Sequence, residues 1–348
     1  ISETISPEFS KVNDYIGLEH IDSGDIHIRR KGIPADVKGG KLKCYKDDII
    51  FGKRRAYLRK AAIVNSDAIC SAHAFVFRAK KDVISNKLFP FFFHSDQFMH
   101  RMIDISVGGL SPTINWSDLK NLDFLLPLKK EQDKLAELLW AINKITEHYK
   151  NLYKKIIILK DSIQRDIFQN YNKIEFKAEY SLLAGYAFKS KDFINSGIPV
   201  VKIKDINESN NSVDVNGIRE FVKFNKKYKK YLIKSGDLIV GLTGAKSGSG
   251  YVGKLGEILN IDKELYLNQR VAKVISNSNN TNSLTKLLMN SSSFLNDVWR
   301  RSNEGAQANI STEDFCKCLI PDLKLDKEKY NKLSLQVYKN LDLIESNL

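Results

Sequence analysis

The sequence is poor in the features that mark several common classes of protein. It holds only four cysteines, Cys44, Cys70, Cys316 and Cys318, and no two pairs stand at the spacing of a zinc finger. Its six histidines form no metal-ligand pattern. No apolar run approaches the roughly 18 to 20 residues that span a bilayer, and no secretory signal is evident. We therefore expect free thiols, no metal site, no membrane association and a cytoplasmic location.

Motifs for nucleotide binding and catalysis are also missing. In the glycine-rich stretch "GLTGAKSGSGYVGK", Ala245 separates Gly244 from Lys246, whereas a Walker phosphate loop has its lysine directly after the last glycine. Neither the Asn-Pro-Pro-aromatic motif of adenine methyltransferases nor a glycine-rich S-adenosylmethionine loop is found. An Asp…Glu-x-Lys pattern between Asp166 and Lys177 imitates a nuclease metal site, but it has no second copy. The sequence predicts no catalytic residue.

Positive charge, by contrast, is abundant. The 348 residues include 55 lysines and arginines against 41 acidic residues, a net charge of +14. A surplus of this size favours a polyanionic partner such as a nucleic acid. The hydrophobic content of 43% is ordinary for a globular protein, and the length is sufficient for two or three domains.

Segments of the first half recur, in the same order, in the second half. The pairs are "YIGLEHIDSGDI" with "VVKIKDINESNN", "KDDIIFGKRRA" with "KSGDLIVGLTGAK", "SAHAFVFRAK" with "NQRVAKVISN", and "GLSPTINWSDL" with "GAQANISTEDF". An apolar stretch that ends in Pro127 or Pro321 and a helical pattern follow the last pair. Because the matches are collinear, they predict two homologous domains with short strands and a few helical turns.

The helical pattern after the first copy covers residues 131–168, where apolar residues recur alternately at three and four positions without glycine or proline. This spacing is typical of a coiled coil, and the helix would be roughly 57 Å long. We expect it to pack antiparallel to a second helix near the C-terminus, although two unrelated helices remain an alternative. The residues expected at helix or partner contacts are Leu135, Leu138, Ile142, Ile145, Tyr149, Leu152, Ile156, Leu159, Val337, Leu341 and Ile344.

These patterns predict an α+β fold in which domains at 1–128 and 170–322 are separated by helices at 129–169 and 323–348. The stretch "GGLSPTINWSDLKNLDFLLPLKKEQDKLAELL" and its partial copy "GAQANISTEDFCKCLIP" resemble the specificity subunit of type I restriction-modification enzymes. The second copy departs from this family because it lacks the Glu-Gln pair after its proline and has a shorter helix.

The resemblance implies that the chain is not itself an enzyme. Each domain would be a target-recognition domain that reads one half of a split site on double-stranded DNA. The helices would form an antiparallel coiled coil that separates the domains and docks two methylation subunits and the restriction and translocation subunits. S-adenosylmethionine, ATP and Mg²⁺ would bind to those partners, and no cofactor would bind to this chain.

Cationic and amide-bearing loops are the candidate DNA contacts. For the phosphates we expect Arg29, Arg30, Lys226, Lys227, Lys229 and Lys230, and for the phosphates or the base edges we expect the loop residues Lys53, Arg54, Arg55, Arg59, Thr243, Lys246 and Ser247. For the base edges we expect Ser71, His73, Ser111, Asn115, Asn268, Gln269, Arg270, Gln307 and Asn309. The lysines could equally form a solvated face, and the polar residues could be turn or cap residues.

Two other functions stay open at this point. A stand-alone restriction endonuclease with an unrecognised active site would need a divalent metal and would cleave DNA alone. A structural adaptor would bind only proteins through its helices, and its affinity for DNA would be absent or insensitive to salt.

Overall fold

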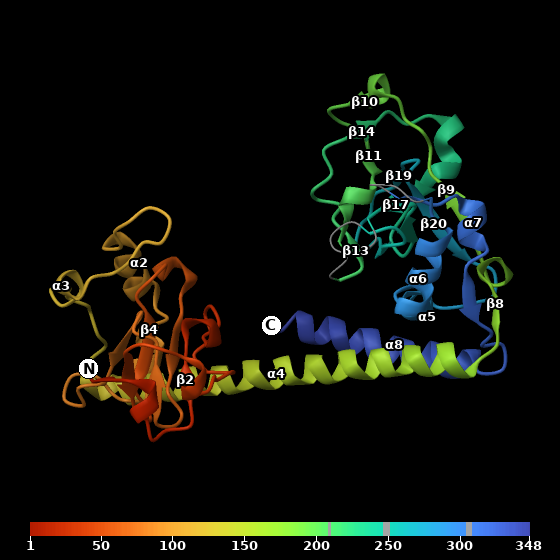
Figure 1. The fold of residues 1–348 in the computed structure, drawn as a ribbon. Helices are drawn as coiled ribbons and strands as arrows, with labels where there is room; N and C mark the ends of the chain where they lie inside the picture. The colour runs from red at the N-terminus through yellow and green to blue at the C-terminus, as the bar shows by residue number, and fades with distance from the viewer. Residues whose placement is uncertain (208–209, 246–250, 304–307) are drawn as a thin grey trace. The chain divides into compact units, whose positions relative to one another are not determined.

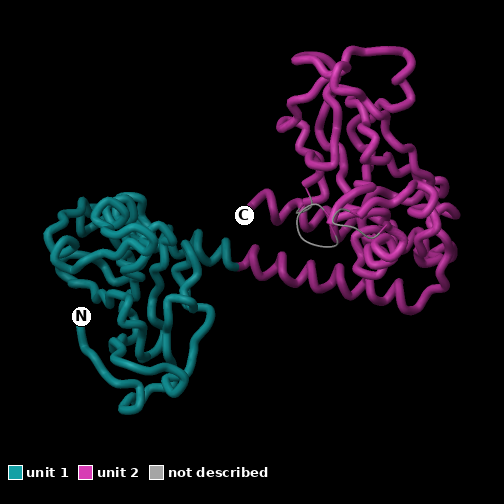
Figure 2. Tube along the Cα trace, turned by 45° about the horizontal axis from the view of Figure 1, so that its top comes forward, with its two compact units in different colours: residues 1–147 teal, residues 148–348 magenta. Residues whose placement is uncertain are grey.

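The computed structural model describes residues 1–207, 210–245, 251–303 and 308–348, and it divides the chain into two units, Ile1–Glu147 and His148–Leu348 (Figures 1 and 2). Each unit has its own sheets and its own buried core. Lys246, Ser247 and Gln307, which the sequence suggests as DNA contacts, lie outside the described residues.

Unit 1 contains two small sheets and three short helices. The four-stranded sheet has the order β1-β3-β6-β2, formed by Thr4–Ile5, Lys41–Cys44, Ala68–Cys70 and Tyr15–Ile16. The three-stranded sheet has the order β5-β4-β7, formed by Ala61–Ile63, Ile49–Gly52 and Ala74–Phe77. The helices α1, α2 and α3 are Phe89–Phe92, Asp96–Asp104 and Trp116–Leu119. The central strand β4 is buried on both faces, which agrees with its continuous apolar run.

Unit 2 repeats this arrangement with sheets that contain more strands. The five-stranded sheet β10-β14-β11-β19-β15 is formed by Phe193–Ile194, Phe221–Val222, Ile198–Val201, Leu265–Leu267 and Leu232–Ile233. The six-stranded sheet β12-β13-β18-β16-β20-β9 is formed by Ile206–Asn207, Ser212–Val213, Leu255–Glu257, Leu238–Gly241, Val271–Ser276 and Tyr180–Ala184. Two strand pairs join β8 Lys173–Glu175 to β22 Leu319–Pro321, and β17 Thr243–Gly244 to β21 Ala308–Asn309. The helices α5, α6 and α7 are Asn282–Met289, Ser292–Arg301 and Thr312–Cys316.

The strand pairing confirms the internal repeat. Tyr15 pairs in parallel with Ile69 in unit 1, and Val200 pairs in parallel with Tyr266 in unit 2. An antiparallel strand, β3 or β15, lies on the other side of β6 or β19. Parallel pairs need a crossover connection and are therefore a specific mark of topology. The two units share one fold.

Matching side chains support matching turns. The Asp48 carboxylate accepts a hydrogen bond from the Tyr45 backbone at 2.9 Å, and the Asp237 carboxylate accepts one from the Lys234 backbone at 3.0 Å. The second helix of each unit begins after a serine: Ser95 accepts from the Phe98 backbone and Ser291 from the Phe294 backbone, both at 3.2 Å. Such caps satisfy N–H groups that a helix N-terminus leaves unpaired.

The predicted long helix is α4, Lys129–Asn170, and the C-terminal helix is α8, Lys327–Glu345. Tyr153 of α4 donates to Glu345 at 3.0 Å, and Tyr330 of α8 donates to Asp166 at 3.3 Å. Late residues of α4 therefore meet early residues of α8, so the pair is antiparallel, as expected (Figure 1).

The apolar residues of α4 that the sequence predicts at helix or partner contacts are buried over only part of the helix. Ile156 is buried in the same core as Val337, Leu341 and Ile344, with Tyr149 packed against that core. Leu135 packs against a small core of unit 1. The remaining predicted contact residues on α4 are each more than a third exposed: Leu138 58%, Ile142 52%, Ile145 57%, Leu152 38% and Leu159 50%. For Leu138, Ile142 and Ile145 the reason is length, because α8 has 19 residues against 42 in α4, and its last residue, Glu345, contacts Tyr153. Leu159 lies within the stretch that α8 accompanies and is exposed on a face that α8 does not cover.

Candidate nucleic-acid interface

Three loops of unit 1 meet at the end of β4. The backbone N–H of Lys53 donates to the carbonyl of His73 at 3.1 Å, and the N–H of Ile114 donates to the carbonyl of Lys53 at 2.9 Å. A further bridge joins Arg54 to Thr113. The chain thus brings residues 53–59, 71–73 and 107–115 together, and we call them the unit 1 loop cluster. This cluster contains most of the DNA contacts that the sequence predicts for unit 1.

The same bonds build a unit 2 loop cluster from residues 242–245, 268–270 and 308–310. The N–H of Leu242 donates to the carbonyl of Arg270 at 3.0 Å, and the N–H of Ile310 donates to the carbonyl of Leu242 at 3.0 Å. Thr243 pairs with Asn309 through β17 and β21, at the position of the Arg54–Thr113 bridge. The two loop clusters therefore have the same arrangement of backbone hydrogen bonds, which we call the backbone frame.

The unit 1 loop cluster presents cationic and polar side chains to solvent. Arg54, Arg55, His73, Ser111 and Asn115 are exposed. Partial burial and the positive charges of Arg54 and Lys53 lower the pKa of His73 below its ordinary value. The imidazole is therefore neutral at pH 7, and its ring offers one donor and one acceptor. This combination suits the edge of a base pair in the major groove.

Two arginines in this cluster have an unusual backbone conformation. Arg55 and Arg59 have φ values of +53° and +48°, on either side of a short 3-10 helix, Ala56–Leu58. A left-handed residue with a side chain costs about 1–2 kcal/mol. Strain of this kind concentrates at functional sites. Arg59 also forms an ion pair with Asp96 at 2.8 Å.

In the unit 2 loop cluster, some predicted contacts are exposed and others are buried. Gln269 and Arg270 are exposed, and Arg270 donates to the Asn309 side chain at 2.7 Å. Thr243 is only 4% exposed and Asn268 only 9%, so these two residues build the frame of the loop. A Cβ atom at Gly185 would lie 2.1 Å from the Asn268 carbonyl, which explains why glycine stands beside this turn.

A lysine-rich 3-10 helix, Lys226–Tyr231, lies beside the same loops. Lys226, Lys227, Lys229 and Lys230 are exposed. The buried ring of Tyr228 is 4.6 Å from the Tyr186 ring, and Tyr186 itself forms a bridge with Asn268. The aromatic cluster thus holds the lysines next to the unit 2 loop cluster. Tyr186 is not among the residues that the sequence predicts, because an isolated tyrosine carries no signal of its own.

The first two arginines of unit 1 are already ion-paired. Arg30 contacts Asp22 at 2.5 Å. Arg29 contacts Asp25 at 2.9 Å and Glu147 of α4 at 2.7 Å. Their assignment as DNA contacts stays a prediction.

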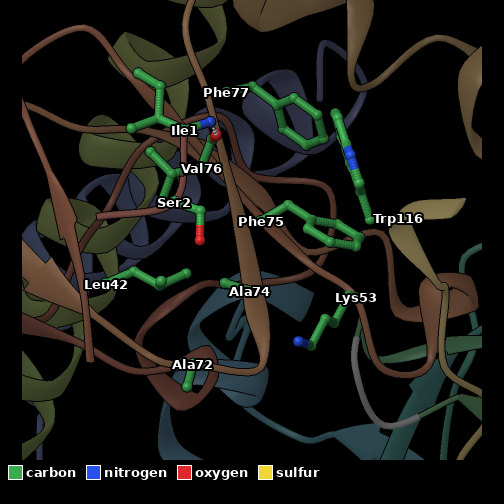
Figure 3. A pocket seen from close by; sticks show the side chains of 10 residues that line it. All are labelled: Ile1, Ser2, Leu42, Lys53, Ala72, Ala74, Phe75, Val76, Phe77 and Trp116. Carbon is green, nitrogen blue, oxygen red and sulfur yellow. Dashed lines mark hydrogen bonds between the residues drawn. The ribbon is translucent and has the colours of Figure 1, made fainter. Parts of the chain in front are cut away.

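A cavity of about 440 Å³ lies along the outer edge of β7, lined by Phe75, Phe77, Trp116 and Lys53 among others (Figure 3). In unit 2 the matching edge of β20 pairs with β9, where Ala272 faces Ala184. The cavity of unit 1 therefore lies where a further strand lies in unit 2. We interpret it as a sheet edge, at which the Ile1 amine donates to the Val76 carbonyl at 2.8 Å, and not as a ligand pocket.

Within the described residues, no group of three or more histidine, cysteine or acidic side chains is placed to hold a metal ion. In the same part of the chain, no helix combines the length and the apolar character needed to cross a bilayer. In the nuclease-like pattern, Glu175 pairs with Lys177 at 2.5 Å, while Asp166 accepts from Asn170 at 2.7 Å.

Comparison with known proteins adds an independent finding. The family model of the type I restriction modification DNA specificity domain matches residues 10–157 and, again, residues 178–346. The S subunit of a type I restriction-modification system from M. genitalium has the same fold, with a TM-score of 0.61 at 12% identity over 99% of this chain and 91% of that one. The HsdS subunit from Thermoanaerobacter tengcongensis matches with a TM-score of 0.43 at 14% identity, over 99% and 88%. No curated protein matches the sequence.

Proposed function

The chain belongs to the type I restriction modification DNA specificity family, whose domain it carries twice, and we propose that it reads a split DNA target with one loop cluster per half-site. It would act as the specificity subunit of a cytoplasmic restriction-modification enzyme. The observation that supports this proposal most strongly is the pair of loop clusters, which have one backbone frame and different side chains.

The side chains at matching positions of the two loop clusters differ, as expected if the two units read different base pairs. His73 and Arg270 occupy the same place in the frame, as do Lys53 and Leu242, because their backbone bonds correspond. Arginine pairs well with guanine, and a neutral histidine can both donate and accept. The two units are therefore suited to different base pairs.

Backbone contacts would supply most of the affinity. The net charge of +14 and the exposed lysines of Lys226–Tyr231 favour binding to phosphates, which releases counterions and depends strongly on salt. These lysines would position unit 2 on the duplex, while Gln269 and Arg270 would read bases.

The helices would dock the other subunits. Leu138, Ile142 and Ile145 of α4 are each more than half exposed, and a contiguous apolar stripe on a helix is typical of a protein interface. Two methylation subunits and the restriction and translocation subunits are the proposed partners. S-adenosylmethionine, ATP and Mg²⁺ would serve those subunits, and this chain would contribute no catalytic group.

The proposal can be tested by selecting bound DNA from random duplexes. The full chain would be co-produced with the methylation subunit of its own operon, without metal and at two salt concentrations. We expect enrichment of two short motifs separated by a fixed number of unread base pairs. Cleavage by the chain alone on addition of Mg²⁺ would favour the endonuclease. The absence of DNA binding, or binding insensitive to salt, would favour the adaptor.

A further inference from the structure

Unit 1 is fastened to α4 by side chains of the segment 25–29. Arg29 Nη2 lies 2.7 Å from Glu147 Oε2, while Arg29 Nε donates to Asp25 Oδ2 at 2.9 Å. His27 Nε2 is hydrogen-bonded to Asn143 Oδ1 at 2.8 Å. We call these five residues the α4 clamp. All of them belong to unit 1.

The helix is attached to unit 1 at a second, separate place. Near its start, the Gln132 side chain accepts from the Ser85 backbone at 2.7 Å and donates to the Val83 carbonyl at 3.1 Å. Gln132 and Glu147 are 15 positions apart, or roughly 22 Å along the helix axis. Between these places, the Trp140 indole donates to the Lys87 carbonyl at 2.9 Å. Because unit 1 is held at several places along the helix, it cannot pivot about one of them. The α4 clamp is the last of these places along the helix.

The geometry of Arg29 argues against its assignment as a phosphate contact. Its guanidinium is shared between two carboxylates, and the side chains of Asp25 and Glu147 are only 18% and 21% exposed. The hydrogen bond to Asp25 raises the pKa of Arg29. Burial alone would raise the pKa of Asp25, but hydrogen bonds from Arg29 and the His27 backbone bring it below its ordinary value. A phosphate would have to displace a charged partner from this site.

Unit 2 has a counterpart of the Gln132 attachment, but a different residue occupies the position of His27. Asn331 of α8 accepts from the Thr281 backbone at 2.9 Å, as Gln132 does from Ser85. His27 forms a parallel bridge with Ile63, and Ser212 forms the corresponding bridge with Glu257. The Ser212 hydroxyl donates to Asn210 at 2.7 Å. The α4 clamp is therefore a feature that distinguishes unit 1.

We propose that Arg29 is a positioning residue, which with His27 holds the unit 1 loop cluster at a fixed angle to α4 and so restricts the spacing of the half-sites. This inference rests on the proposed function. From Glu147 to Asn170 the helix extends by a further 23 residues, roughly 35 Å. A rotation of about 6° at the clamp would move the far end by about 3.4 Å, which is the rise of one base pair.

The test compares Arg29→Ala, Glu147→Ala and the double variant, each as the full chain with its methylation subunit. Affinity is measured for the selected target with its own spacer and with spacers one base pair shorter or longer. For the wild type we expect a loss of about tenfold or more on either altered spacer. For each variant we expect this discrimination to fall to about threefold or less, with the double variant no worse than the single ones.

A phosphate contact would give a different pattern. Arg29→Ala would then weaken binding on all three spacers alike and reduce the salt dependence, whereas Glu147→Ala would not. That result would overturn the positioning role. Arg30→Ala is the matched control, since Arg30 pairs with Asp22 and with the Glu19 carbonyl. As a predicted phosphate contact, Arg30 should contribute equally on all three spacers, so Arg30→Ala should weaken binding to them alike and leave the ratio between them unchanged.

A second measurement needs no DNA. Hydrogen exchange of the α4 amides at 141–148 should become about tenfold faster in Glu147→Ala, and unchanged exchange would overturn the clamp. If the wild type selects no split motif, the proposed function fails and the spacing role fails with it. If the wild type selects a split motif and all variants keep its spacer preference, only the role of Arg29 is overturned.

Discussion

Position 59 in unit 1 is an arginine and the matching position 253 in unit 2 is a glycine, yet both have a left-handed backbone, with φ values of +48° and +87°. They match because Gly52 donates to the Lys60 carbonyl and Gly241 to the Lys254 carbonyl, both at 2.9 Å. Glycine adopts this conformation without strain, whereas arginine does not. The two units therefore have the same backbone conformation at this position, and unit 1 carries the charged side chain of Arg59 there in spite of the strain.

The comparison separates two kinds of position. Residues that build the frame keep their chemistry, as Asp48 and Asp237 do at one turn and Ser95 and Ser291 do at one helix cap. Exposed residues on that frame differ freely. A fold with a constant frame and variable loops allows two half-sites to be read by two versions of one domain.

The largest expected effect is the loss of stability in one unit when a large buried ring is removed from it. Phe98 of α2 and Phe294 of α6 hold the same position after their capping serines and are 2% and 0% exposed. Substitution of either by alanine should lower the stability of its own unit by about 3–5 kcal/mol. Calorimetry of the full chain should show one transition move while the other stays in place. A joint shift of both transitions would mean that the units do not unfold separately.

Removal of the amide that anchors each long helix should have the next largest effect. Gln132→Ala leaves the Ser85 N–H and the Val83 carbonyl without their partner and should destabilise unit 1 by about 1–3 kcal/mol. Asn331→Ala should cost less, because Gln132 is fully buried and Asn331 is half-buried. Equal losses in denaturant unfolding would contradict this ranking.

A substitution in one loop cluster should change the reading of one half-site. Arg270→Ala should reduce discrimination at a single position of one half-site by about 1–3 kcal/mol and leave the other half-site unaffected. His73→Ala is the matched variant in unit 1 and should affect the other half-site. Competition binding with single-base variants of the target would measure both. A uniform loss across all sequences would instead identify Arg270 as a backbone contact.

The smallest expected difference is in the response to acid. Burial lowers the pKa of His94, which is hydrogen-bonded to the Ala61 carbonyl at 2.9 Å. The native ring thus stays neutral below about pH 6.5, where the unfolded ring takes up a proton. Unit 1 should therefore lose stability as the pH falls from 6.5 towards the native pKa. Unit 2 has Asn290 at the matching position, before its capping serine.

Unfolding of unit 1 should be compared at pH 7.5 and pH 5.5 in the wild type and in His94→Asn. The variant should show a weaker dependence on pH. An identical dependence would mean that other groups cause the acid response.

Much of this organisation could be predicted from the sequence, and the remainder depends on long-range contacts. Collinear matches identified the repeat, and apolar spacing identified both helices and their antiparallel packing. A stripe of apolar residues does not show how far its partner helix extends, so the sequence could not tell that Leu138 and Ile142 are exposed while Ile156 is buried against α8. A cation in a loop looks the same whether it meets DNA or a carboxylate 118 positions away, as Arg29 and Glu147 are.

The central claim is that each unit independently reads one half of a split target, and a domain exchange tests it most directly. Residues 170–322 would be replaced by the corresponding domain of a family member that has a different known target, and the DNA selection would be repeated. We predict that one half-site changes to that of the donor while the other half-site and the spacing are retained. A change in both half-sites, or in neither, would contradict the claim.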